Sequence, residues 1–259
     1  MTRGGTGELP VWAGVALRGV ASIVVFAVAF ALLWQGAVWA LAMPPYLMPT
    51  PLDAAGALVG QGDKILANAL FTLAEAGVGL IVAAALAVVL GGLFVASPAA
   101  HRLAFPWAVA LRSVPVVAIA PIVTLMVGRG FWAGVTVVVL AAFFPILVNC
   151  MRGYVSLPRG ALEMMHVLDA RPAEVLWYVR LPYAVGFVFS GLRTAAPIAI
   201  LGAMLSEWLT GNRGLGYLIL DSAALRELDL LWAAIVVSML LGLLIFWTTA
   251  TLEGALRRV

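Results

Sequence analysis

Long, almost uninterrupted apolar runs constrain this chain more than any other feature of its sequence. The first extends over residues 11–43, and the later ones are bounded by proline-rich or charged segments. About 20 consecutive apolar residues suffice for a helix to cross the hydrocarbon core of a bilayer. A soluble core cannot bury this excess, because 64% of the 259 residues are hydrophobic and 10% are charged, against roughly 45–50% and 25% in soluble domains. The sequence therefore predicts an all-α polytopic membrane protein.

The breaks between the apolar runs predict six transmembrane helices in one domain that covers residues 1–259. We expect them at 16–42, 68–96, 103–127, 131–150, 182–205 and 230–252. The first run exceeds the apolar region of about 7–15 residues in a cleaved signal peptide, so we expect it to be retained. A short surface helix is expected after Pro51. The other parts are a tail at about 1–14, a polar loop at about 151–181 and a connection at about 206–229.

The distribution of basic residues predicts the orientation of these helices. Six spans place both termini on the same side, and ten of the 15 Lys and Arg residues fall on that side, Arg112 among them. Because cytoplasmic loops carry the excess of Lys and Arg, we expect both termini and the loop at 151–181 to be cytoplasmic. The arginines are scattered and the net charge is only +3, so we expect no nucleic-acid binding.

The segment 163–182 is too polar to cross a bilayer and too apolar for a solvated linker. Apolar residues from Leu157 to Leu168 recur at spacings that form one helical stripe. Pro172 suits the first turn of a second short helix. The pattern predicts two short amphipathic helices. They either lie on the membrane surface or dock into a cytoplasmic protein.

Motifs for catalysis are missing from this sequence. A phosphate-binding P-loop needs Gly-Lys-Ser/Thr, but the single lysine, Lys64, lies in Gly-Asp-Lys-Ile. His101 and His166 are far apart and Cys150 is the only cysteine, so we expect no metal site. The sequence predicts a chain that is not an enzyme and that cannot hydrolyse ATP by itself.

The segment 163–182 also resembles a known family motif. Glu163-Met164-Met165, three residues, Asp169, nine residues, Val179, one residue and Leu181-Pro182 have the spacing of the EAA loop. In that loop the pattern is Glu-Ala-Ala, three residues, Gly, nine residues, Ile, one residue and Leu-Pro. The loop marks the permeases of binding-protein-dependent ABC importers. The chain is therefore similar to an inner-membrane component of such an importer.

Four further motifs resemble the nitrate, sulfonate, taurine and bicarbonate branch of that family. They are Met-Pro-Thr-Pro at 48–51, Arg-Ser-Val-Pro at 112–115, Phe-Phe-Pro-Ile with a following Asn149 within 142–149, and Gly-Leu-Gly-Tyr at 214–217. Their order along the chain matches the family from about residue 47 onward.

The resemblance implies a six-helix type I ABC importer permease that carries a small solute delivered by a substrate-binding protein. It implies a second copy of the permease, an extracytoplasmic substrate-binding protein and two ATP-binding cassette subunits, which bind ATP and Mg²⁺. No cofactor is expected in this chain. The ATPase-coupling residues would be Glu163, Met164, Met165, Asp169, Leu181 and Pro182.

Two departures from the family motif leave local questions open. Asp169 replaces Gly and acts either as a left-handed turn residue or as the cap of the second short helix. Met164 and Met165 replace the two Ala residues. We expect both Met side chains to fill the ATPase groove, because thioethers adapt to irregular surfaces.

Charged and polar residues at membrane depth are candidate pathway or gate residues: Glu75, Asn149, Arg193 and Glu207. Glu75 stands where the resembling branch has Arg. It indicates a cationic substrate, a swapped ion pair or a side chain that reaches water. Arg193 is expected to pair with a carbonyl or carboxylate. Glu207 is expected just past the fifth helix, as a gate or receptor contact or as a solvated helix end.

The alternative function is an ion-coupled secondary transporter. Such a carrier would need a relay of intramembrane acids and internal symmetry. Glu75 is the one acid that the sequence places clearly inside a span, and no repeat is evident.

Overall fold

The computed structural model describes residues 11–44 and 47–256, and all regular structure within these ranges is helical. The elements are α1 (Val11–Ala40), α2 (Pro51–Gly60), α3 (Gly62–Ala96), α4 (Pro98–Ser113), α5 (Val116–Val127), α6 (Phe131–Val155), α7 (Arg159–Val167), α8 (Pro172–Val175), the π-helix η1 (Leu176–Arg180), α9 (Leu181–Thr210), α10 (Leu215–Leu225) and α11 (Leu228–Leu256).

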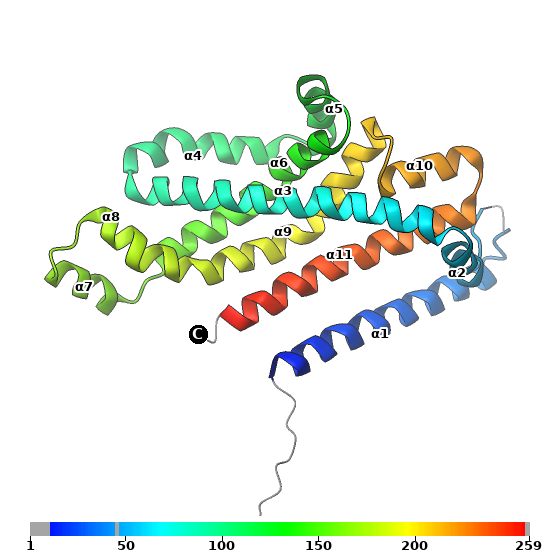
Figure 1. The fold of residues 1–259 in the computed structure, drawn as a ribbon, viewed down its shortest axis with the longest axis horizontal. Helices are drawn as coiled ribbons and strands as arrows, with labels where there is room; N and C mark the ends of the chain where they lie inside the picture. Colours follow the sequence, from blue (N-terminus) through cyan, green and yellow to red (C-terminus); the bar gives the residue numbers. More distant parts are fainter. Residues whose placement is uncertain (1–10, 45–46, 257–259) are drawn as a thin grey trace, which may run out of the picture.

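Three long helices, α3, α6 and α9, run side by side and form the centre of the bundle (Figure 1). The helix α11 packs along α9, and α1 lies outside α11 and α2. The short helices α7 and α8 project from one end, and α2 and α10 lie at the opposite end (Figure 1). We call these the α7 end and the α10 end.

Four stretches of the described chain are long and apolar enough to cross a membrane: α3, α6, the α8–α9 stretch and α11. They confirm the second, fourth, fifth and sixth predicted spans. The first predicted span corresponds to α1, which already includes residues 11–14 of the predicted tail. Residues 1–10 of that tail lie outside the described part of the chain.

The third predicted span, at 103–127, is wrong as one continuous helix. It begins earlier, as α4 at Pro98, and breaks between Ser113 and Val116, where α4 and α5 meet at a bend of 106°. Pro115 has no N–H to donate, and it forces the preceding Val114 into an extended conformation. Arg112 therefore lies in the last turn of α4, well away from the α4 start at the α7 end where the charge count had placed it.

The short helix expected after Pro51 is confirmed as α2. Thr50 caps it: its hydroxyl oxygen accepts a hydrogen bond from the Asp53 N–H, and its own O–H and N–H donate to the Asp53 carboxylate at 2.7 and 2.9 Å. These bonds lower the pKa of Asp53. The Thr-Pro pair therefore starts a helix by a capping box.

Small residues let the central helices approach closely. Ala76, Ala83 and Ala87 of α3 are fully buried. A Cβ atom added to Gly191 of α9 would lie 2.9 Å from the Cα of Ile146 in α6. Close packing of this kind drives helix association in a bilayer. The hydrophobic effect does not, because lipid tails are as apolar as the side chains of the helices.

We expect Gly191→Ala to destabilise the bundle by about 1–3 kcal/mol, because the added methyl group forces α6 and α9 apart. The matched control is Gly202→Ala on the same helix, where the added Cβ would meet Val138 at an ordinary 3.5 Å. Thermal unfolding in detergent measures both variants. Equal melting temperatures for the two would contradict the packing described here.

Candidate functional site

The two methionines of the EAA-like motif have different environments. Both lie on α7, but Met164 is 58% exposed and Met165 is 8% exposed. Val167 and Leu168 are exposed beside Met164, and Glu163 is exposed on the same helix. The exposed apolar surface of α7 therefore includes Met164, whereas Met165 faces the chain's own interior.

Asp169 is a turn residue. Its φ angle is +49°, in the left-handed region. Its N–H donates to the carbonyl of His166, and the N–H of Ala170 donates to the carbonyl of Met165, both at 3.0 Å. This pair of bonds is a Schellman motif, the commonest use of Gly after a helix. The cap of α8 is Arg171, whose N–H donates to Glu174 at 2.7 Å, so the capping alternative for Asp169 is excluded.

Leu181 and Pro182 are the first two residues of α9 and follow η1 directly. Leu181 packs with Leu176 against a small buried cluster around Tyr154. The last part of the motif therefore joins the projecting α7–η1 segment to a membrane-length helix.

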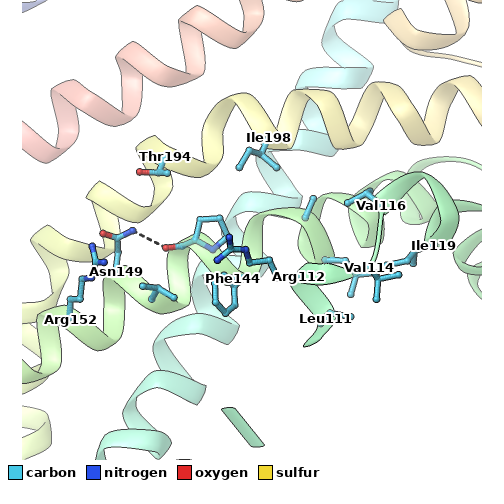
Figure 2. A pocket seen from close by; sticks show the side chains of 14 residues that line it. Leu111, Arg112, Val114, Val116, Ile119, Phe144, Asn149, Arg152, Thr194 and Ile198 are labelled. Carbon is cyan, nitrogen blue, oxygen red and sulfur yellow. Dashed lines mark hydrogen bonds between the residues drawn. The ribbon is translucent and has the colours of Figure 1, made fainter. Parts of the chain in front are cut away.

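A groove of about 400 Å³ lies between the α4–α5 bend, α6 and α9. Figure 2 shows Arg112, Arg152, Asn149 and Thr194 around it, with Phe144 below Arg112. The Arg112 guanidinium carbon lies 5.3 Å from the centre of the Phe144 ring. Asn149 donates to the carbonyl of Pro145 at 2.8 Å. The groove thus combines two guanidinium groups with apolar walls, and it contains one of the four predicted pathway residues.

Arg193 forms an ion pair with Glu253 of α11, with Nη1 and Oε2 3.2 Å apart. The Ser190 hydroxyl donates to the other carboxylate oxygen of Glu253 at 2.6 Å. Arg193 was expected to pair with a carbonyl or a carboxylate, and the partner is the carboxylate of Glu253. Its partner was missed because the sixth span was expected to end at 252, whereas α11 continues to Leu256.

Glu207 belongs to a buried polar cluster at the α10 end. The predicted solvated helix end is wrong: α9 continues to Thr210, and Glu207 is 2% exposed. Its two carboxylate oxygens accept hydrogen bonds from the Thr72 hydroxyl at 2.6 Å and from the Gly216 N–H at 2.7 Å. Glu207 therefore joins α9 to α3 and to the start of α10.

The connection at 206–229 contains the helix α10, which the polar prediction missed. Three N–H groups at its start have side-chain acceptors. Gly214 donates to Asn68 at 2.7 Å, Leu215 to Thr72 at 2.8 Å, and Gly216 to Glu207. Gly214 has a φ angle of +99°, and a Cβ atom there would overlap the Glu207 carboxyl group. The Gly-Leu-Gly sequence thus leaves space for the Glu207 carboxylate at the N-terminus of α10. A helix N-terminus stabilises negative charge.

Glu75 is 1% exposed and lies well inside α3. Its carboxyl group is next to that of Glu207 and faces Gly134, where a Cβ atom would overlap it. The water-reaching alternative is wrong. Among the side chains that the structure describes, neither Glu75 nor Glu207 has an Arg or Lys ion-pair partner, so these side chains provide no swapped ion pair. Both acids lie apart from the groove that contains Asn149.

The part of the chain that the structure describes contains no group of three His, Cys, Asp or Glu residues close enough to hold a metal ion. The absence of a metal site stays a prediction.

Membrane-length helices with a projecting amphipathic segment form a fold that is shared with a type I ABC importer permease. An inward-facing methionine ABC transporter structure matches this fold with a TM-score of 0.67 at 16% identity, over 76% of this chain and 98% of that one. The family of binding-protein-dependent transport system inner membrane components matches residues 79–258. The chain belongs to this family.

Relatives agree with this assignment. The formylaminopyrimidine transport permease of Halalkalibacterium halodurans is 32% identical over 82% of this chain and 85% of its own length. The nitrate import permease of Synechococcus elongatus is 28% identical over 69% of this chain and 62% of its own. The protein is therefore a multi-pass membrane subunit of an ATP-driven importer, and the ATPase of such importers is a separate subunit.

Asp169→Gly should keep the α7–α8 turn and raise stability by up to about 1 kcal/mol, because Gly adopts a positive φ without strain. Asp169→Val should lower stability by about 1–2 kcal/mol. Thermal unfolding, with limited proteolysis of the α7–α8 turn, measures both. Equal stability of the two variants would show that the turn tolerates any residue.

Thr72→Val should lower stability by about 2–6 kcal/mol, because it removes the hydroxyl that pairs with the Leu215 N–H and with a Glu207 oxygen, at about 1–3 kcal/mol for each lost partner. The control is Thr248→Val, since Thr248 is exposed and bonds only to its own helix at Leu244. Thermal unfolding compares the two. A Thr72→Val protein as stable as the control would mean that the cluster does not hold α10.

Proposed function

We propose that two copies of this chain form the membrane path of an importer, with two ATP-binding cassette subunits docked on the α7 segments. The observation that carries the proposal is the exposed apolar surface of Met164, Val167 and Leu168 on a helix that projects beyond the membrane-length helices. A partner subunit would cover that surface. The extracytoplasmic substrate-binding protein would dock at the α10 end.

The proposed orientation places both termini and the α7 end in the cytoplasm of a bacterial cell, with the bundle in its cytoplasmic membrane. Arg152, Arg159, Arg171 and Arg180 lie at or near the α7 end, as the positive-inside rule requires of a cytoplasmic face. Arg112 leaves the count because it lies in the last turn of α4, away from the α7 end. The remaining excess still favours this orientation.

The proposed mechanism couples two states of the ATPase pair to two states of the permease pair. ATP binding draws the ATPase subunits together and moves both α7 helices toward each other. The bundles then turn from inward-facing to outward-facing and receive the solute from the binding protein, and hydrolysis resets them. ATP and Mg²⁺ are bound by the partner subunits.

We propose that the groove lined by Arg112, Asn149 and Arg152 forms half of the solute path. It is open on one side, so a second copy could close it. A guanidinium group against a phenyl ring, with apolar walls around it, suits a planar polar organic solute better than a small inorganic ion. The greater similarity to a formylaminopyrimidine permease than to a nitrate permease supports the same choice.

The test reconstitutes the permease, its ATPase subunit and its binding protein in vesicles that contain ATP. We expect vanadate-sensitive uptake of a labelled pyrimidine and no uptake of nitrate. Uptake that ignores vanadate and follows a proton gradient would instead establish the ion-coupled alternative.

In that system Met164→Ala and Met165→Ala should differ. Met164→Ala removes part of the docking surface and should weaken ATPase binding by about tenfold without changing the melting temperature of the permease alone. Met165→Ala removes a buried side chain, so it should lower that temperature instead. Titration of the ATPase subunit onto each permease variant, with thermal unfolding of the permease alone, separates the two effects. Identical behaviour of the variants would exclude Met164 as a docking residue.

A further inference from the structure

A π-helical turn joins the α7–α8 segment to α9. The N–H of Leu181 donates to the carbonyl of Leu176, five residues earlier. Pro182 has no N–H, and in a regular α-helix its ring would collide with the carbonyl of Tyr178. The extra residue in the turn relieves this collision. If the turn lacked this extra residue, the segment before Leu181 would be rotated by about 100° about the helix axis. The Leu-Pro pair therefore sets the direction from which α8 enters the bundle.

Tyr154 occupies the place where η1 meets the bundle. It is 1% exposed, and its hydroxyl donates to the carbonyl of Val88 in α3 at 3.0 Å. Gly91 and Gly92 make room for its ring, since a Cβ atom on Gly91 would lie 3.3 Å from the ring. Tyr154 therefore ties the end of α6 to α3.

Arg180, the last residue of η1, bonds to the same tyrosine. Its Nη1 donates to the Tyr154 carbonyl at 2.6 Å. In a continued helix this carbonyl would accept from residue 158, but Pro158 has no N–H. A cation is also favoured at a helix C-terminus. Arg180 thus satisfies a carbonyl that α6 leaves open.

The contact between α7 and the bundle is looser. A cavity of about 320 Å³ separates Leu162 and Met165 of α7 from the end of α3, and Leu176 and Arg180 of η1 also line it. The hydrogen bond from the projecting segment to α6 is made by η1, through Arg180. A displacement of α7 would reach the bundle through η1.

We propose that Tyr154 and Arg180 are positioning residues, which form the joint through which movement of α7 is transmitted to α3 and α6. The joint links three elements by two hydrogen bonds, from Arg180 to the Tyr154 carbonyl and from the Tyr154 hydroxyl to Val88. The proposal rests on the proposed function, because it needs an ATPase docked on α7.

The experiment measures solute imported per ATP hydrolysed in the reconstituted complex, for Tyr154→Phe and for the control Tyr183→Phe. Tyr183 is 42% exposed on α9 and outside the joint. We expect the ratio to fall about fivefold in Tyr154→Phe, the factor for one lost hydrogen bond, and to stay unchanged in Tyr183→Phe. A lower melting temperature with an unchanged ratio would make Tyr154 merely structural and would overturn the proposal.

Arg180 variants test the second bond of the joint. Arg180→Met should lower the ratio, and Arg180→Lys should restore part of it, because Lys retains a cationic donor. The double variant Tyr154→Phe with Arg180→Met should lose less than the product of the two single effects, since both act on one unit. Independent effects would refute a common joint. Failure of the unmodified complex to import would count against the proposed function instead.

Discussion

The structure depends on one constraint, which is that backbone N–H and C=O groups freed at helix ends need hydrogen-bond partners. Three helix ends meet it in three ways. The start of α10 uses side chains of α3 and α9, the end of α6 uses Arg180, and the end of α7 uses a Schellman motif at Asp169. Each solution fixes how a short element is attached to the long helices.

The motifs by which the family is recognised coincide with these helix ends. Gly-Leu-Gly-Tyr supplies the α10 start, where Gly214 leaves space for the Glu207 carboxyl group. Leu-Pro imposes the π turn before α9. The position held by Asp169 is the left-handed residue after α7. The motifs are thus explained by helix-end chemistry, and the exposed residues proposed to dock a partner lie on or directly after α7, within the EAA-like motif.

Sequence reasoning located the apolar spans because a membrane-length run of apolar residues has few other possible structures. It failed where one residue decides the path of the backbone. Pro115 breaks a span that three prolines interrupt, and nothing in the sequence alone marks Pro115 rather than Pro106 or Pro121 as the one that bends it. It also predicted only a polar connection around Gly214 and Gly216, although the apolar residues beside them, such as Leu215 and Leu218, pack into the core.

The sequence by itself determined the class of the protein, the approximate spans and the position of the EAA-like segment, because hydropathy and motif spacing are local properties. Only the tertiary structure decided that Met164 is exposed while Met165 is buried. It alone brought Glu75 and Glu207, 132 positions apart in the sequence, to one buried site, and it alone placed Tyr154 between α3 and η1. These facts depend on how helices distant in sequence pack, through small residues whose contacts no local pattern specifies.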